Sequence, residues 1–467
     1  MRVGFHTLGC KLNQSETEAV ADAFRRAGHD PLGLDDEADL YIVNTCTVTS
    51  KSEQKARRLL RKILGEHPGR PVVVMGCYAE MEKRRVEELG DGVFAVGLGD
   101  MAGLPEALAL RGFPASPARD ANAVFGSRDG ESFASGAEAS GDDSLPSRIR
   151  AWLGGKADPA REEARFRFHP SRYSFHTRAF LKIQDGCDNR CSYCRVRLAR
   201  GPSLSLDAGE ALDRFRRLEE AGHGEIVLTG INLSSYRSRG LDLGGLLREI
   251  LSGGGGARIR LSSLEPEAVT ENLAETLRHP RICPHFHLAV QSGSDPVLRA
   301  MRRRYNRLTV CQAVARLRGA APHPFIAADL IVGFPGETPE DHGETVAMVR
   351  DLRFADLHVF PFSPRPGTEA AGMAGRVPER LVRERAAELR SLAEQGLFRY
   401  GTETVGSVLD VMVERCDLPG GGWEGAAENY LTVRGGPGGE GLPAQGSRIP
   451  VRITDFRDGF AWGRADE

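Results

Sequence analysis

The sequence predicts a multidomain α/β protein: an N-terminal open α/β domain, a central partial (β/α)6 barrel and a C-terminal small all-β barrel. Strand-like runs alternate with helix-like stretches in residues 1–113 and again in residues 171–400, which supports the first two domains. In residues 401–467 the chain changes to short strands separated by Gly/Pro turns. Residues 114–170 are rich in Ala, Ser, Gly and Asp, a composition typical of a flexible linker or insertion.

The charge balance, the absence of long apolar runs and the cysteine content limit which classes of protein this chain can belong to. The chain has 467 residues, with 62 Lys+Arg against 64 Asp+Glu, so the overall charge neither indicates nor excludes a nucleic-acid partner. The N-terminal residues lack the apolar core of a signal peptide, and no apolar run is long enough to span a bilayer. We therefore expect a cytoplasmic protein with no membrane partner. Thiols stay reduced in the cytosol, so the nine cysteines favour ligation or catalysis over disulfides.

Three strand-like runs near the N-terminus each end in a cysteine. The runs are MRVGFHTLGC, DLYIVNTC and PVVVMGCYA, and they end at Cys10, Cys46 and Cys77. The intervening segments predict helices from Ser15 to Ala27, with a Ser15/Glu18 capping box, and from Ser52 to Leu64. Parallel strands bring their carboxyl ends to one edge of a sheet, so the three thiols are expected to converge. Cysteines that merely fill a sheet core would lie at random depths along the strands. Three converging thiolates can hold an iron–sulfur cluster that has one open iron.

The linker region contains one further signal. Ser147 to Lys156 predicts a short helix, to which the sequence assigns no catalytic task.

The stretch DGCDNRCSYCR places Cys187, Cys191 and Cys194 within eight residues. Their spacing would also fit one face of a helix, but Gly186 and the polar residues between them are typical of a turn after the strand-like run AFLKIQ. A structural zinc site normally has four ligands, and no fourth Cys or His is adjacent. Three thiolates on a four-iron cube leave one iron open for a substrate or cofactor.

Six strand-like runs predict the central barrel. They are AFLKIQ (179–184), EIVLTG (225–230), RIRLSSLE (258–265), HFHLAVQ (285–291), FIAADLIVGF (325–334) and DLHVFPF (356–362). In such barrels the chemistry lies at the carboxyl ends of the strands. The segments that follow strands two to five are Thr229 to Asn232, Glu265 and Pro266, Gln291 to Ser294, and Gly333 to Glu337.

The C-terminal region is acidic, although its pattern predicts a small β-barrel. Residues 401–467 contain six arginines and no lysine against eleven acidic residues. Binding of RNA there would need a local arginine face, formed by Arg434, Arg448, Arg452 and Arg457. More basic patches occur at residues 55–62 and 299–307, and either is a candidate tRNA contact.

The Cys-x3-Cys-x2-Cys loop after the first central strand resembles the signature of the radical S-adenosylmethionine enzymes. The resemblance implies that the open iron is chelated by that cofactor, whose reductive cleavage gives a 5′-deoxyadenosyl radical. It also implies that the backbone near Val332 and Gly333 contacts the adenine. Gln291, Ser292 and Gly293 would line the methionine or ribose side.

A three-cysteine α/β domain ahead of such a barrel resembles the methylthiotransferases. The strings that carry this likeness are FHTLGCKLNQSETEA, NTCTVTSKSEQKARR, VMGCYAE, IQDGCDNRCSYCR, EIVLTGIN, QSGSDPVLRAMRRRY, VGFPGET and FPFSPRPGT. They resemble above all the enzymes that act on threonylcarbamoyladenosine beside the tRNA anticodon. The C-terminal strands, with Asn429, Tyr430 and Val433, are similar to the RNA-binding barrel called TRAM.

This resemblance implies two [4Fe-4S] clusters and S-adenosylmethionine as cofactors, with methylthiolation at C2 of the adenine. The auxiliary cluster, held by Cys10, Cys46 and Cys77, would supply or carry sulfur, and a second S-adenosylmethionine would supply the methyl group. The implied partners are the tRNA anticodon stem-loop, a reductant such as flavodoxin or ferredoxin, and a sulfur donor that the sequence does not identify. The sequence identifies no catalytic residue beyond the cluster ligands.

The chain departs from this family's pattern after Cys194. The run from Arg195 to Gly201 contains three arginines where a more apolar, proline-containing stretch is expected. The cluster ligands are unaffected, but the packing or substrate contacts of this segment are open.

Two alternatives remain at this stage. One is a methylthiotransferase that acts on isopentenyladenosine in tRNA or on an aspartate of a ribosomal protein. The other is a non-enzymatic iron–sulfur regulator that binds RNA, which would need one redox cluster and no cofactor cleft. The remaining cysteines, Cys283, Cys311 and Cys416, are expected to be structural.

Overall fold

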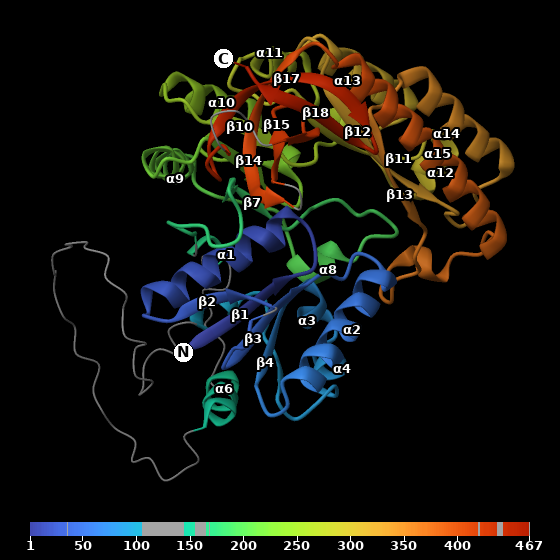
Figure 1. Ribbon diagram of the computed structural model, residues 1–467. Coiled ribbons are helices and arrows are strands. Elements are labelled where there is room, and N and C mark those ends of the chain that lie inside the picture. Colours follow the sequence, from blue (N-terminus) through green and yellow to red (C-terminus); the bar gives the residue numbers. More distant parts are fainter. Residues whose placement is uncertain are drawn as a thin grey trace.

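The computed structural model describes residues 1–34, 36–104, 144–154, 165–167, 169–418, 421–436 and 442–466. Most of the predicted linker, residues 114–170, lies outside these residues. Figure 1 shows three parts: an N-terminal α/β layer structure, an arc of central strands backed by helices, and a C-terminal barrel set against that arc.

The N-terminal part is a parallel five-stranded sheet with helices on both faces. Its strands are β1 (Arg2–Thr7), β2 (Asp30–Gly33), β3 (Leu40–Thr45), β4 (Val72–Gly76) and β5 (Val93–Ala95), in the order β2-β1-β3-β4-β5. Helix α1 (Lys11–Arg26) packs on one face through Val20 and Phe24, and α2 (Ser50–Glu66) packs on the other through Leu60 and Ile63. The strand order reverses between β1 and β3, which is where open α/β sheets bind their ligands. The short strands β2 and β5 were not predicted.

Helix α1 begins four residues before its predicted start. Cys10 is its N-cap, and Asn13 occupies the third helical position of the capping box, so the prediction of a Ser15/Glu18 box was wrong. Glu18 has another task, because its carboxylate accepts the backbone N–H groups of Ser174 and Phe175 at 2.7 and 2.9 Å. A buried carboxylate that tethers a distant segment has the same sequence signature as a capping residue.

A helix within the predicted linker belongs to the N-terminal core. Helix α6 (Leu145–Gly154) starts two residues before the predicted Ser147 to Lys156 helix. Leu145 and Ile149 are buried in the same cluster as Val3 and Phe24. This part of the 114–170 segment is therefore packed on the sheet that carries α1.

The central part is a six-stranded parallel partial barrel, as predicted. Its strands are β6 (Ala179–Lys182), β9 (Glu225–Thr229), β10 (Arg258–Leu261), β11 (His285–Gln291), β12 (Phe325–Val332) and β13 (Asp356–Pro361). They form two three-stranded sheets, β10-β9-β6 and β11-β12-β13. Two parallel bridges connect these sheets, one between Ile259 and Ile282 and one between Leu264 and Leu288. The main outer helices are α9 (Ala208–Glu220), α10 (Leu243–Ser252), α13 (Arg307–Arg318), α14 (Pro339–Leu352) and α15 (Glu379–Glu403), with shorter α11 (Glu271–Thr276) and α12 (Asp295–Ala300).

Alternate residues of these strands face outward into one large hydrophobic core. Phe286, Leu288 and Val290 of β11 are buried with residues of the outer helices. Because side chains alternate along a strand, His287 and Ala289 face the inner side of the arc.

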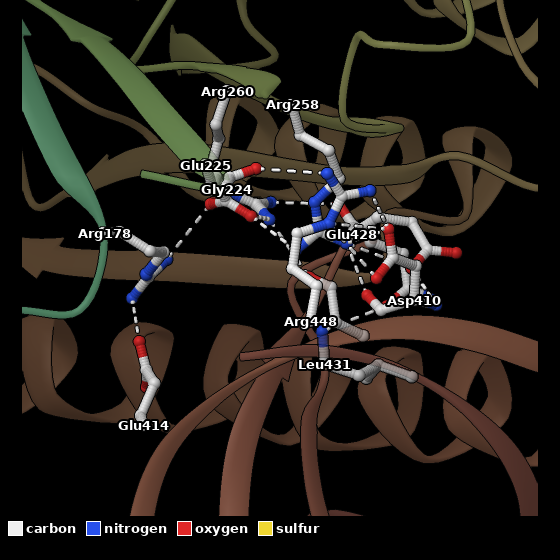
Figure 2. A network of polar contacts seen from close by, with 12 residues as sticks. Arg178, Gly224, Glu225, Arg258, Arg260, Asp410, Glu414, Glu428, Leu431 and Arg448 are labelled. Atoms are coloured by element: carbon white, nitrogen blue, oxygen red, sulfur yellow. Dashed lines mark hydrogen bonds and ion pairs between the residues drawn. The ribbon is translucent and has the colours of Figure 1, made fainter. Parts of the chain in front are cut away.

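The C-terminal part is a closed five-stranded barrel. Its strands are β14 (Val408–Leu418), β15 (Gly422–Ala427), β16 (Thr432–Gly435), β17 (Arg448–Arg457) and β18 (Phe460–Ala465), in the order β14-β15-β16-β18-β17. It packs against the amino ends of the central strands, where buried Glu225 pairs with Arg258 and Arg260 at 2.7 and 2.6 Å (Figure 2). Arg448, expected on an RNA face, instead pairs with Asp410 and donates to the carbonyl of Gly224 in this interface.

Candidate active site

The loop between the short strand β7 (Gln184–Asp185), which follows β6, and the short helix α8 (Val196–Arg200) carries Cys187, Cys191 and Cys194. Gly186 has φ 68°, and a Cβ there would lie 1.8 Å from the carbonyl oxygen of Pro202, so only glycine fits this turn. Gln184 holds the loop from beneath by donating to the carbonyl of Gly186 at 2.7 Å and accepting from the Asn232 N–H at 2.7 Å. The second predicted strand end therefore supports the cysteine loop directly.

Each of these three sulfurs faces an N–H donor. Asn232 Nδ2 lies 3.9 Å from Cys187 Sγ, Arg303 Nη1 donates to Cys191 Sγ at 3.1 Å, and the Val196 N–H donates to Cys194 Sγ at 3.4 Å. Such donors stabilise thiolate charge and tune the potential of an iron–sulfur cluster.

Burial makes two of the thiols of this loop weaker acids than a free cysteine. Burial, reinforced by the neighbouring Cys191, raises the pKa of the Cys194 thiol to about 12, and burial raises the pKa of Cys187 as well. A metal that binds these thiols therefore has to displace their protons. The donor set fits a cluster with three protein ligands.

The N-terminal cysteines follow three adjacent strands and are linked by side-chain amides. The Cys10 thiol donates to Asn13 Oδ1 at 3.1 Å, and Asn13 Nδ2 donates to Asn44 Oδ1 at 2.7 Å. Asn44 lies two residues before Cys46, and it returns a bond to the carbonyl of Asn13 at 2.9 Å. The Asn13–Asn44 pair thus joins the segments that carry the first two thiols across the switch point of the sheet.

The third thiol approaches the same point because of a glycine. Gly76 has φ 92°, and a Cβ there would lie 2.3 Å from Asn44 Oδ1 and 2.4 Å from the carbonyl of Thr45. Glycine therefore lets the backbone before Cys77 come into contact with the backbone before Cys46. Burial, together with the charges of Cys10 and Cys77, raises the pKa of Cys46 to about 12. The structure brings Cys10, Cys46 and Cys77 together, and this donor set also fits a cluster held by three thiolates.

Arg200 connects the two cysteine sites. It is fully buried, and its Nε donates to Cys77 Sγ at 3.1 Å. Its Nη1 pairs with Glu16 of α1 at 2.7 Å and with Asp185, two residues before Cys187, at 3.1 Å. Burial raises the pKa of Cys77 to about 11, and the Arg200 guanidinium opposes that rise. A single side chain thus spans from the N-terminal thiols to the base of the cysteine loop.

A second arginine of the run after Cys194 also joins the N-terminal sheet to the central barrel. Arg195 is buried and pairs with Glu82 at 2.9 Å and with Glu53 of α2 at 3.4 Å. Arg365, which follows β13, pairs with the same Glu53. The arginine-rich segment after Cys194 therefore fixes the N-terminal sheet against the central barrel, which explains the departure noted in the sequence.

The predicted cofactor-lining residues lie at adjacent strand ends. Gln291, with φ 65°, ends β11, and Val332 ends the neighbouring β12. A Cβ on Gly293 would lie 2.6 Å from Thr345 Cα, and one on Gly333, with φ 74°, would lie 2.4 Å from Val382. Both glycines are thus required by close packing, and Ser292 is buried beside Thr345. Their contact with S-adenosylmethionine remains a prediction.

Sequence reasoning missed the supporting residues of both sites. Asn13, Asn44, Arg200 and Arg303 have no local motif that marks them, since their partners lie far away in the chain. Arg303 was assigned to a basic patch, yet it points inward to Cys191 and pairs with Glu265. Cys283 is buried, as expected of a structural cysteine.

A second polar cluster lies on the inner face of the central barrel. Asp329 of β12 accepts from His287 of β11 at 2.9 Å and from His358 of β13 at 3.1 Å. The hydrogen bond to Asp329 raises the pKa of the His358 imidazole. Burial raises the pKa of Asp329, but the hydrogen bonds from His287 and His358 outweigh it and lower that pKa to about 2. No sequence signal singled out this cluster.

No helix in the described part of the chain is long and apolar enough to cross a membrane.

Two protein families match this chain. Residues 2–97 match the uncharacterized protein family UPF0004, and residues 181–349 match the radical SAM superfamily. The first match includes the strands that carry Cys10, Cys46 and Cys77, and the second includes the Cys187 loop. The fold and the cysteine loop thus define a radical S-adenosylmethionine protein.

Curated relatives narrow the class further. The chain is 40% identical to a Treponema pallidum protein named threonylcarbamoyladenosine tRNA methylthiotransferase MtaB, over 97% of this chain and 98% of the relative. A Bacillus subtilis protein of the same name is 33% identical over 88% of this chain and 84% of its own length. A Geobacter metallireducens protein named tRNA-2-methylthio-N(6)-dimethylallyladenosine synthase is 32% identical over 96% and 94%.

Solved structures support the fold. The radical S-adenosylmethionine methyltransferase TsrM from Kitasatospora setae aligns with a TM-score of 0.50 at 16% identity, over 79% of this chain and 73% of that one.

The chain belongs to the tRNA methylthiotransferases of the radical S-adenosylmethionine class. It is therefore an enzyme that acts on an adenosine of tRNA, with [4Fe-4S] clusters and S-adenosylmethionine as cofactors. Membership in this family excludes the alternatives of a non-enzymatic regulator and of a ribosomal-protein substrate.

Proposed function

We propose that this enzyme methylthiolates C2 of N(6)-L-threonylcarbamoyladenosine next to the tRNA anticodon. The observation that carries the proposal is the 40% identity to a relative of that name, which extends over almost the full length of both chains. Relatives named for the dimethylallyl substrate are 30 to 33% identical. The substrate is recognised as part of an unpaired loop, so no helix has to be melted.

Each cysteine trio holds one cluster. Cys187, Cys191 and Cys194 hold the cluster that binds S-adenosylmethionine, and Cys10, Cys46 and Cys77 hold the auxiliary one. When bound, these groups supply the radical, the sulfur and the methyl group. The placement of the trios, connected through Arg200, supports a shared substrate position.

The chain's own residues orient and protect these groups. Asn232, Arg303 and Arg200 donate N–H bonds to sulfur, which stabilises the thiolates. Gln291, Ser292, Gly293, Val332 and Gly333 line the S-adenosylmethionine position.

The domain assignment follows this division of tasks. Residues 1–113 carry the auxiliary cluster, 171–400 the radical chemistry, and 401–467 form a TRAM module that contacts RNA beside the anticodon stem-loop. A flavodoxin or ferredoxin supplies electrons.

The test compares two anticodon stem-loop RNAs, one with threonylcarbamoyladenosine and one with isopentenyladenosine. Each is incubated anaerobically with the reconstituted enzyme, S-adenosylmethionine and reductant, and nucleosides are analysed by mass spectrometry. We expect the 2-methylthio product from the first RNA only. Product from the isopentenyl RNA alone would overturn the proposal. Nucleosides from a strain that lacks the gene should lack the 2-methylthio derivative of threonylcarbamoyladenosine.

A further inference from the structure

Lys11 places a positive charge beside the N-terminal cysteines and inside the central arc. It directly follows Cys10 and is the first residue of α1. Its ammonium lies 5.0 Å from the centre of the Tyr430 ring, which comes from the C-terminal barrel. Arg260 and Arg178 lie 5.0 and 5.6 Å from the same ring, and His285 stacks on it with ring centres 4.2 Å apart. Three cations therefore share one aromatic side chain.

These cations differ in their counterions. Arg260 pairs with Glu225 at 2.6 Å, and Arg178 pairs with Glu414 at 2.9 Å (Figure 2). Among the described residues, no carboxylate lies within ion-pair distance of the Lys11 ammonium. Lys11 thus shares the Tyr430 ring with two guanidinium groups, whose like charges repel its ammonium. An anion that binds here would relieve this unfavourable charge.

His358 is a further polar side chain on the inner face of the barrel, where its Nδ1 and Nε2 lie 3.1 and 3.8 Å from the carboxylates of Asp329 and Asp356. It lies on β13, its side chain is 47% exposed, and it donates to Asp329. His285, which stacks on Tyr430 beside Lys11, lies on the same face of β11 as His287, and the His287 and His358 rings are 4.7 Å apart. Phe360, two residues after His358 on β13, is also exposed and offers an aromatic surface on that face. The inner face thus presents an imidazole and an aromatic ring, and Lys11, which follows Cys10, lies beside His285 and Tyr430 on that side of the arc.

We propose that Lys11 and His358 bind the carboxylate of the threonyl group on the substrate adenosine and so select this substrate over the isopentenyl one. The threonylcarbamoyl group ends in a carboxylate, whereas the isopentenyl group is an apolar hydrocarbon. The half-buried Lys11 ammonium, which pairs with no carboxylate of the described residues, favours the first group and offers nothing to the second. The inference rests on the proposed function and assigns the residues that recognise its substrate. A backbone phosphate is the other anion that an ammonium can bind.

The test uses the full chain reconstituted with both clusters, and it measures binding without reductant. Three anticodon stem-loop RNAs are compared by fluorescence anisotropy: one with threonylcarbamoyladenosine, one with the same group as its carboxamide, and one with adenosine. The variants are Lys11→Gln, Lys11→Arg and His358→Gln. Lys51→Gln is the matched control, because Lys51 is an exposed lysine at the start of α2.

We expect the wild type to bind the carboxylate RNA about tenfold more tightly than the carboxamide RNA. Lys11→Gln should remove this preference, Lys11→Arg should keep part of it, and His358→Gln should reduce it. Lys51→Gln should leave the ratio unchanged, even if a lost phosphate contact weakens all three RNAs.

Three results would overturn the inference: no wild-type preference for the carboxylate, an unchanged preference in Lys11→Gln, or equal weakening of all RNAs by that variant. The last result would indicate a phosphate contact. If the wild type still methylthiolates the threonylcarbamoyl RNA, such a result refutes only the role of Lys11 and His358. If it does not, the proposed function itself fails. Unchanged iron content and S-adenosylmethionine cleavage in each variant show that it is folded.

Discussion

The two cysteine trios show two ways of placing three thiols around one point. Cys187, Cys191 and Cys194 lie in one loop, so their closeness in the chain already places them near one another, and Asn232 and Arg303 support the loop from elsewhere in the central barrel. Cys10, Cys46 and Cys77 lie on three loops, and the parallel sheet brings them together through Asn13, Asn44 and Gly76. The arrangement of the first trio follows from the spacing of its cysteines in the chain. The arrangement of the second requires correct folding of the whole N-terminal sheet.

Removal of the three loop cysteines should have the strongest effect on the chemistry. Replacing Cys187, Cys191 and Cys194 together by Ala should reduce reductive cleavage of S-adenosylmethionine to background, because the cofactor loses its iron anchor. The N-terminal cluster should remain visible in the absorbance spectrum. The measurement is chromatography of 5′-deoxyadenosine after reduction with dithionite. Cleavage at the wild-type rate would refute the assignment of this loop.

The reciprocal variant removes the N-terminal cysteines. Replacing Cys10, Cys46 and Cys77 by Ala should preserve S-adenosylmethionine cleavage and abolish the methylthiolated product, since only sulfur delivery is lost. Product is measured by mass spectrometry of RNA nucleosides, with 5′-deoxyadenosine measured in the same sample. A methylthiolated product from this variant would show that the sulfur does not pass through these thiols.

Arg200 contacts both cysteine sites, and its removal should destabilise the fold. Arg200→Met leaves the carboxylates of Glu16 and Asp185 buried with less compensation, and should lower the free energy of unfolding by about 3–5 kcal/mol. Urea denaturation of the cluster-free protein measures this loss. Arg216→Met, which removes an exposed pair with Asp213, should cost about 1 kcal/mol or less. Equal effects of the two variants would contradict the buried role of Arg200.

The interface far from the clusters supplies a pH-dependent prediction. The Arg260, Arg258 and Arg178 guanidinium groups overcome burial and lower the pKa of Glu225 to about 2, from 4.5. Because the folded-state pKa is lowered, the stabilisation is complete above pH 4.5 and is lost as pH falls toward 2. Its size is about 3 kcal/mol. Glu225→Gln should therefore destabilise the protein most at pH 7, and progressively less below pH 4.5, in urea titrations. A difference from the wild type that does not change with pH would contradict this account.

Much of the fold could be predicted from the sequence because its signals are local. All six central strands and the cysteine loop follow from periodicity and spacing, and strand ends carry Cys10, Cys46 and Cys77. The start of α1 could not be predicted, since Cys10 is an unusual N-cap and Glu18 imitates a capping residue while binding Ser174. The role of Arg195 and Arg200 could not be predicted either. Their partners, Glu53 and Glu16, are remote in sequence, so only the packed structure reveals why arginines follow Cys194.

The central claim is that each trio holds its own cluster. The most direct measurement is the iron and sulfide content, with Mössbauer spectra, of the wild type and of both triple cysteine variants after anaerobic reconstitution. The account predicts two [4Fe-4S] clusters per wild-type chain and one in each variant. A Cys10/Cys46/Cys77 variant with the full wild-type iron content would contradict it, as would loss of both clusters from either variant that remains folded.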